Sequence, residues 1–142
     1  MAKSLQAVSA YARMWPREMF DHVDPRAPRK NTPLAKGVEF LDQAGVYVLY
    51  RDDIPYYIGK ADWLRKRLWW HALKPDARYY NFWNFFSAFV VLDATQRDEV
   101  EGILISAMPT ANSAQPRLPR ERLPKEVIAM IGKIRKTRAN PE

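Results

Sequence analysis

Short runs of β-branched and aromatic residues along this chain predict three strands. Residues 46–50, Val-Tyr-Val-Leu-Tyr, form the clearest run, because such side chains favour extended backbone. Residues 51–53 predict a turn, and residues 56–58 predict the strand that returns from it. Residues 88–92 predict the third strand, and residues 38–41 fit either a short turn or a strand.

Helices are predicted in residues 4–14, 63–73, 96–108 and a C-terminal segment that begins at Pro124. The first helix should stop before Pro16, because the residue preceding a proline avoids the helical region. Asp62 is the expected N-cap of the second helix, and Pro124 suits the first position of the last helix. The order strand, strand, helix, strand, helix and basic helix predicts a compact α/β (α+β) sandwich.

The charge of the chain divides it into three predicted parts. Residues 1–44, an N-terminal extension with an irregular arm at 21–33, carry seven basic and five acidic residues. Residues 45–114, the core, carry eight of each, and residues 115–142 carry eight basic residues against three acidic ones. We expect this basic tail to pack on the core through a helix that points Val127, Ile128, Ile131 and Ile134 inward. An excess of +5 there is expected if the tail binds phosphates, although solubility alone also explains a small basic protein.

The composition excludes several classes of site. The chain has no cysteine, which rules out disulfides and thiolate metal ligands. A bound metal would need oxygen or imidazole ligands, which favours Mg²⁺ or Mn²⁺. No apolar run approaches the roughly 20 residues of a membrane span, and no secretory segment opens the chain. We therefore expect a cytoplasmic protein without a membrane partner, and the sequence leaves its oligomeric state open.

Two residues with useful chemistry, Arg67 and His71, share a stripe of the 63–73 helix with Leu64, Leu68 and Ala72. Both are predicted to face the sheet, where an unpaired charge would be costly. Alternatively, Arg67 covers the core with its alkyl stem and His71 is a satisfied core imidazole. Arg65 and Lys66 fall on other faces and are predicted to be solvated.

The 96–108 helix has a predicted apolar stripe made of Val100, Ile103, Leu104, Ala107 and Met108. Glu101 lies at the border of this stripe, where a carboxylate could hold a hard divalent cation with water and phosphate as the other ligands. Asp98 is predicted to lie further out, and Glu99 is the competing ligand. The alternative for Glu101 is a structural role at the rim of the core, paired with a lysine.

Tyr47 and Tyr57 differ from the other tyrosines because each lies two residues from a glycine, which permits close approach of the backbone. A phenol with a pKa near 10 is only about 0.1% ionised at pH 7, so its use as a general base costs about 4 kcal/mol. A metal, Lys60 or Arg67 would lower that pKa. Without such a cation the phenol would only orient a water molecule.

The triplets Gly45-Val46-Tyr47 and Tyr57-Ile58-Gly59 resemble the two motifs that define the GIY-YIG nuclease family, with valine for isoleucine in the first. Arg67 follows ten residues after the second motif tyrosine, and His71 follows one helical turn later. Residues 101–105, Glu-Gly-Ile-Leu-Ile, match the family's E-x-x-L-I stretch, and Pro109 and Asn112 follow at fitting positions. The resemblance covers residues 45–112.

This resemblance implies a three-stranded antiparallel sheet flanked by helices and a metal-dependent endonuclease that hydrolyses nucleic-acid phosphodiester bonds. Glu101 would hold a single divalent metal, Mg²⁺ or Mn²⁺. The family's other positions would be catalytic at Tyr47, Tyr57, Lys60, Arg67 and His71, and substrate-binding at Gly59 and Asn112. Asn112 would either orient the substrate or brace the site. Within this set Tyr47 would activate the attacking water and Arg67 would neutralise charge on the phosphoryl oxygens.

Family members often carry separate DNA-reading domains, and no segment of that size is present in this chain. Specificity would then come from the N-terminal extension, the tail or the aromatic residues 79–86, which either stack on unpaired bases or belong to the core. DNA is the favoured substrate, with RNA open. The alternatives are a catalytically silent nucleic-acid-binding module that retains the fold, and a structural protein with coincidental motifs.

Overall fold

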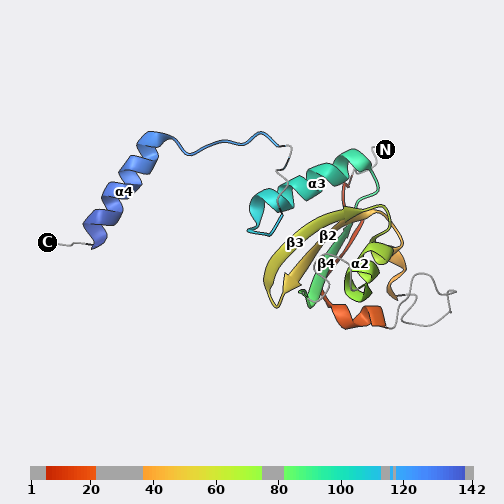
Figure 1. Cartoon of the computed structure of the whole chain (residues 1–142). Helices are drawn as coiled ribbons and strands as arrows, with labels where there is room; N and C mark the ends of the chain where they lie inside the picture. The colour runs from red at the N-terminus through yellow and green to blue at the C-terminus, as the bar shows by residue number, and fades with distance from the viewer. Residues whose placement is uncertain (1–5, 22–36, 75–81, 113–115, 117, 140–142) are drawn as a thin grey trace.

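The computed structural model describes residues 6–21, 37–74, 82–112, 116 and 118–139. Its centre is an antiparallel sheet of four strands in the order β1-β4-β2-β3, namely β1 Ala10–Pro16, β2 Gly45–Arg51, β3 Ile54–Ala61 and β4 Phe85–Val90 (Figure 1). The three predicted strands are confirmed. The predicted strand count is wrong, because the N-terminal extension adds β1 beside β4.

The predicted helix at residues 4–14 is wrong for the part that the structure describes, where β1 forms instead. Pairing with β4 outweighs the local helical preference, since β1 covers the otherwise open edge of that strand. The ladder is irregular between Ala12 and Trp15, where Met14 has a φ of 54° and its N–H donates to Ser87 Oγ at 3.1 Å. The 3-10 helix η1, Arg17–Asp21, follows directly. Residues 22–33 of the predicted arm lie outside the described residues.

The β2–β3 hairpin turns at residues 52–53, as predicted. Asp52 adopts a φ of 56°, a left-handed conformation that aspartate tolerates better than most residues. Asn84 stabilises this turn, because its Oδ1 accepts from the Asp52 N–H at 2.7 Å and its Nδ2 donates to the Asp52 carboxylate at 2.9 Å. The register of the hairpin shifts once between Leu49 and Tyr50, and beyond this irregularity Tyr47 lies opposite Gly59.

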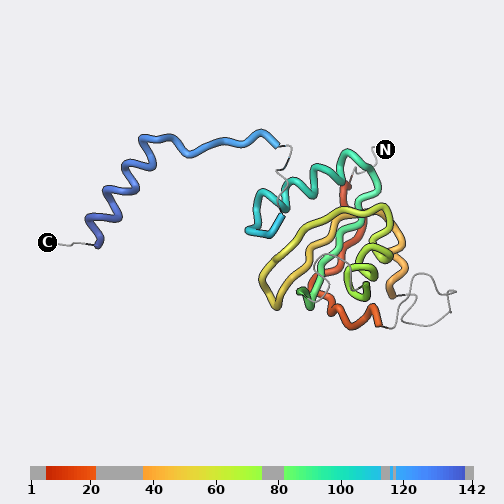
Figure 2. Tube along the Cα trace, viewed as in Figure 1, coloured from red at the N-terminus to blue at the C-terminus, as the bar shows by residue number. Residues whose placement is uncertain are grey.

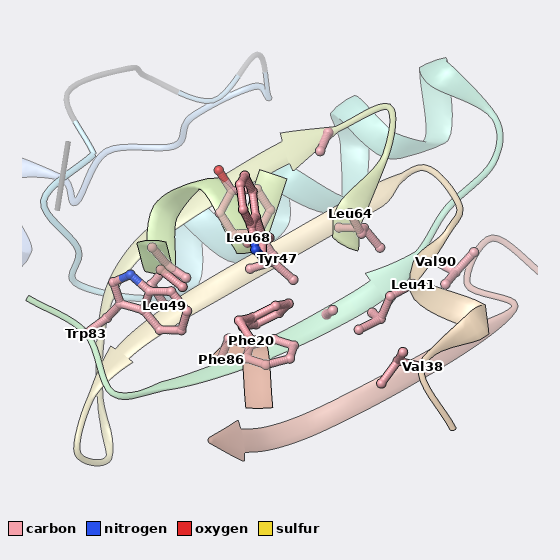
Figure 3. Packing of buried hydrophobic residues seen from close by; sticks show 14 residues of the cluster. Phe20, Val38, Leu41, Tyr47, Leu49, Leu64, Leu68, Trp83, Phe86 and Val90 are labelled. Carbon is pink, nitrogen blue, oxygen red and sulfur yellow. The ribbon is translucent and has the colours of Figure 1, made fainter. Parts of the chain in front are cut away.

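Two helices cover the two faces of the sheet, α2 Leu64–Leu73 and α3 Ala94–Ala107 (Figure 2). The larger core lies on the α2 face and includes Tyr47, Leu64, Leu68, Trp83 and Phe86 (Figure 3). The smaller core lies on the α3 face, where Val46, Val48 and Ile58 pack against Val100, Leu104, Ile105 and Met108. The 3-10 helix η2, Glu39–Leu41, adds Leu41 to the larger core, so residues 38–41 form a turn and not a strand.

The predicted apolar stripe of α3 is wrong at two positions. Ile103 is 52% exposed and Ala107 is also exposed, whereas Ile105, outside the predicted stripe, packs in the smaller core. The helix begins earlier than predicted because Asp93 caps it, with its Oδ1 accepting from the Gln96 N–H at 2.9 Å. The buried side of α3 is therefore turned toward Ile105, and this brings Glu101 close to the core.

The predicted cap of α2 and the predicted solvation of Arg65 are both wrong. Trp63 is the N-cap residue and makes no side-chain cap bond, while Asp62 accepts from Arg97 Nη1 at 3.2 Å. Arg65 is buried, and its Nε lies 2.7 Å from Asp42 Oδ1 in an ion pair that is not an aligned hydrogen bond. The same carboxylate oxygen accepts from Trp63 Nε1 at 2.8 Å. This contact ties the start of α2 to the end of η2.

Replacing Arg65 with alanine should lower the free energy of unfolding by about 3 kcal/mol or more, because the Asp42 carboxylate would lose its buried counter-charge. Urea denaturation measures this loss. Lys66→Ala, one residue along the same helix and exposed, is the matched control and should stay within about 0.5 kcal/mol of the wild type. Equal stability of the two variants would contradict a structural role for the buried pair.

The C-terminal helix α4, Lys125–Ala139, stands apart from the sheet (Figure 1). Pro124 immediately precedes it, and its carbonyl accepts from the N–H groups of Val127 and Ile128. None of its residues is buried, and Ile128 and Ile134 are 54% and 46% exposed. The expected packing of this helix on the core is therefore not found. In the part of the chain that the structure covers, no helix combines the length and apolarity needed to cross a bilayer.

Candidate active site

The ring of Tyr47 lies directly against the backbone of Gly59, its partner across the β2–β3 ladder. A Cβ atom on Gly59 would lie 2.4 Å from both Cζ and Oη of Tyr47. Such a distance is far inside van der Waals contact, so only glycine fits beside this ring. Glycine is required at position 45 for a different reason, because a Cβ atom there would lie 2.0 Å from the carbonyl oxygen of Phe89 in the neighbouring strand.

Tyr47, Tyr57 and His71 form a cluster on the α2 face of the sheet. The Tyr47 Oη lies 2.8 Å from His71 Nε2, and both side chains are buried. The Tyr57 ring lies 6.2 Å from the Tyr47 ring and 6.1 Å from the imidazole, and it is more exposed than either. When Nε2 carries no proton, the phenol donates to it. The pair can then move a proton from the phenol to the imidazole.

Arg67 lies at the surface, and the prediction that it faces the sheet with Leu64 and Leu68 is wrong. The buried arc of α2 is turned toward Arg65 and Trp69, which places Arg67 just beyond its edge. The guanidinium carbon lies 5.6 Å from the centroid of the Trp70 ring, within the range of a cation–π contact. An exposed guanidinium held in this way is available to an anion arriving from solvent.

Lys60 and Glu101 lie on the opposite face of the sheet, with α3. Lys60 pairs with Val46 in the ladder, and Val46 packs against α3, so the lysine shares that face. Its Nζ forms an ion pair with Asp98. Burial raises the pKa of the Glu101 carboxyl, the ammonium of Lys60 lowers it, and Asp98 raises it again. Glu99, the competing ligand, is exposed.

Glu101 and Asp98 fit a hard divalent cation. They lie three residues apart on one side of α3, and the ammonium of Lys60 already shows that this position attracts a cation. A carboxylate whose pKa is raised by burial gains from a nearby positive charge. Within the described ranges no three Asp, Glu, His or Cys residues gather as a metal cluster. Water and phosphate oxygens would therefore complete the coordination, as Mg²⁺ commonly requires.

Asp98 was not among the sequence-predicted site residues. Its spacing of three residues before Glu101 was the available signal, because residues at that spacing lie side by side on a helix. Periodicity placed Asp98 further from the apolar stripe than Glu101 and left Glu99 as the competing ligand, whereas in the structure Asp98 lies beside Lys60 and Glu101.

Asn112 braces the edge strand that carries several of these residues. Its Oδ1 accepts from the Ile58 N–H at 2.9 Å, and its Nδ2 donates to the Ile58 carbonyl at 2.7 Å. The N–H of Ala111 also donates to the Tyr56 carbonyl at 2.7 Å. The Asn112 amide thus acts like a further strand along the open edge of β3. Of the two predicted roles, bracing the site or orienting the substrate, the contacts support bracing.

The edge strand β3 links the two groups of residues. The Tyr57 side chain projects toward α2, on the face where Gly59 meets the Tyr47 ring, whereas Ile58 and Lys60 project toward α3. The phenols with His71 therefore lie on one side of this edge, and the acidic residues of α3 lie on the other. A ligand that reaches both groups has to cross the rim of the sheet at β3.

No protein-family model matches this chain, and no curated protein matches it. Among solved structures, the chain is similar to the GIY-YIG N-terminal endonuclease domain of UvrC from Thermotoga maritima bound to magnesium, its catalytic divalent cation. Identity is 26%, the match covers 56% of this chain and 92% of that chain, and the TM-score is 0.43. Two point mutants of that domain bound to the cation give the same identity and TM-score, with 91% of their chains covered.

Proposed function

We propose that this protein is a metal-dependent endonuclease that hydrolyses phosphodiester bonds of nucleic acid, with DNA as the favoured substrate. The observation that carries this proposal is the buried hydrogen bond between Tyr47 and His71, formed over Gly59 and beside Tyr57. It supplies what a phenol needs to act near neutral pH, namely a neighbouring group that accepts its proton.

In this proposal, Tyr47 and His71 act together on the attacking water. The water gives a proton to the Tyr47 oxygen while the phenol gives its own proton to His71 Nε2, so no free phenolate has to accumulate. This avoids the cost of about 4 kcal/mol for ionising a phenol at pH 7. Tyr57, which is the more exposed phenol, forms the outer wall of the route by which water reaches Tyr47.

The charged residues bind the phosphate and the metal. Arg67 neutralises charge that develops on the phosphoryl oxygens, and Lys60 positions the phosphate from the other side of β3. Glu101 holds the divalent cation together with Asp98, and this cation, when bound, polarises the phosphate and stabilises the leaving oxygen. Asn112 keeps β3 in register, so that Tyr57, Gly59 and Lys60 hold their places.

The test of this function is an incubation with supercoiled plasmid, branched DNA and single-stranded RNA, each with Mg²⁺, Mn²⁺ or EDTA. Metal-dependent nicking of at least one substrate is expected, and EDTA should abolish it. Binding of all three without cutting would overturn the enzymatic proposal in favour of the catalytically silent module.

We expect the basic C-terminal segment to strengthen binding without shaping the reaction. Deleting residues 119–142 removes seven basic and three acidic residues but keeps Pro116 and Leu118, which lie next to Gly102 of α3. The truncated protein should bind a duplex more weakly and with a flatter dependence on salt, because fewer counterions are released. Salt titrations of the equilibrium constant measure this slope.

An unchanged slope would remove the tail from the binding surface. The control is the double variant Lys133→Gln and Lys136→Gln in the full chain, which keeps α4 and removes two of its cations. It should shift the slope in the same direction by a smaller amount.

A further inference from the structure

A groove of about 370 Å³ opens beside α2, next to the tyrosine–histidine cluster but separate from it. It is lined by Ala61, Asp62, Trp63, Lys66, Arg67 and Trp70. Its volume lies in the range of roughly 300–1,000 Å³ that is usual for small-ligand sites. The proposed reaction uses only Arg67 from this groove, which leaves two indoles and a lysine unexplained.

Both indoles are held in place by the fold. Trp63 donates from Nε1 to Asp42 Oδ1 at 2.8 Å, and the same carboxylate also pairs with the buried Arg65. Trp70 meets the ring of His71 edge-on, with centroids 5.1 Å apart. The two aromatic surfaces are therefore positioned before any ligand arrives, which lowers the entropic cost of binding.

A cationic side chain lies over each indole ring of the groove. Lys66 Nζ lies 5.7 Å from the Trp63 ring, and Arg67 Cζ lies 5.6 Å from the Trp70 ring. Both cations are exposed, and over the ranges that the structure describes neither forms an ion pair with a carboxylate. Asp62 also lines the groove, but Arg97 binds its carboxylate. The groove thus combines flat aromatic surfaces with exposed positive charge that can bind an anion.

We propose that this groove binds an unpaired nucleobase together with an adjacent phosphate. The base stacks on an indole, and the phosphate contacts Lys66 or Arg67. Inside a duplex the faces of a base are covered by its neighbours, so only an unpaired or extruded base presents a free face to the groove. Resting on the proposed function, this inference names the substrate class as strands with unpaired nucleotides near the cut, such as flaps, branches and single strands.

Binding measured in EDTA tests this site without any cleavage. Fluorescence anisotropy would compare oligothymidylate, an abasic strand of equal length and a duplex. Trp70→Ala should weaken binding of oligothymidylate about tenfold and leave binding of the abasic strand unchanged, because only the first offers bases to stack. Trp70→Phe should restore most of the loss, which separates lost stacking from faulty folding.

Two charge variants and one aromatic control complete the design. Lys66→Gln should weaken binding of the base-bearing and the abasic strand equally, whereas Asp62→Asn should strengthen both by removing a repulsive charge. Tyr11→Ser removes an aromatic ring that is 66% exposed on β1, far from the groove along the sheet, and should change nothing. Quenching of tryptophan fluorescence by oligothymidylate, but not by the abasic strand, is expected in the wild type.

Three outcomes would overturn the inference: an equal loss for both strands in Trp70→Ala, tighter binding of the duplex than of the single strand, or equal competition by polyglutamate. The last outcome would make the groove a site for acidic chains in general. Because no cleavage enters the measurement, failure of the nuclease proposal leaves this result intact. Conversely, cleavage that persists unchanged in Trp70→Ala would reject the base site and keep the nuclease.

Discussion

Replacing Glu101 with glutamine is expected to lower the rate of metal-dependent cleavage by about a thousandfold or more, while nucleic-acid binding persists. A carboxylate that holds the catalytic cation supports several kcal/mol of transition-state stabilisation, and each 1.4 kcal/mol changes a rate about tenfold. Glutamine keeps the size of the side chain but removes the charge. Single-turnover cleavage at saturating Mg²⁺ measures the rate, and anisotropy in EDTA measures the binding.

The neighbouring acids of α3 supply the controls. Glu99→Gln changes an exposed carboxylate two residues away and should leave the rate unchanged. Asp98→Asn should reduce the affinity for Mg²⁺ more than the maximal rate, because this residue adds charge beside the cation and also binds Lys60. If Glu99→Gln abolished cleavage and Glu101→Gln did not, the proposed assignment of the metal ligand would be wrong.

Glu101→Gln should also make the metal-free protein more stable at neutral pH. Burial raises the pKa of the Glu101 carboxyl above its ordinary value of 4.5, so the folded state holds this proton more tightly than the unfolded state. The stability that Glu101 contributes is therefore present at low pH and is lost as the pH rises through the raised pKa. Glu101→Gln removes this loss.

Thermal denaturation in EDTA at pH 7 and at pH 4 checks the direction. The melting temperature of Glu101→Gln should exceed that of the wild type at pH 7 by a few degrees at most, and the difference should shrink at pH 4. An inactive variant that is more stable than the wild type would identify Glu101 as a residue kept for function. A variant that is less stable at pH 7 would instead favour the structural role at the rim of the core.

Local sequence patterns predicted the hairpin and the helices α2 and α3, because the pattern of apolar and polar side chains that indicates each element lies within its own segment. The strand β1 could not be predicted in this way. It depends on β4, some 75 residues further along the chain, whose Phe89 and Ala88 lie opposite Tyr11 and Ala12 in the ladder. A segment with mixed local preferences becomes a strand when an open edge is present.

The same limit applies to individual side chains of the candidate site. Helical spacing correctly predicted that His71 faces the sheet, and the glycine two residues from Tyr57 predicted close backbone approach. Spacing failed for Arg65 and Arg67, because the partner that buries Arg65 is Asp42, which belongs to a different element. The burial of a charged residue is decided by its partner, and one sequence does not show which residues become neighbours.

Tyr47→Phe is expected to lower the cleavage rate by about 10²- to 10⁴-fold, the usual range for the loss of a positioned proton-transfer group. The phenylalanine ring still fits against Gly59, so substrate binding should change little, while the buried His71 Nε2 loses its partner and stability falls by about 1–3 kcal/mol. Tyr50→Phe is the matched control, since it also removes a hydroxyl from β2 but packs in the smaller core. A rate that survives in Tyr47→Phe and falls in Tyr57→Phe would transfer the activation of water to Tyr57.

Gly59→Ala should displace the Tyr47 hydroxyl without changing Tyr47 itself. The added methyl group would lie 2.4 Å from the end of the Tyr47 ring, so the ring must move and the 2.8 Å contact with His71 must break. We expect Gly59→Ala to lower the cleavage rate nearly as much as Tyr47→Phe and to lower stability more, because the added methyl group also displaces the buried ring. In the double variant the rate should fall no further, because both changes remove the same proton transfer. Losses that multiply would show that Gly59 serves the reaction independently, for example by letting substrate approach the backbone of β3.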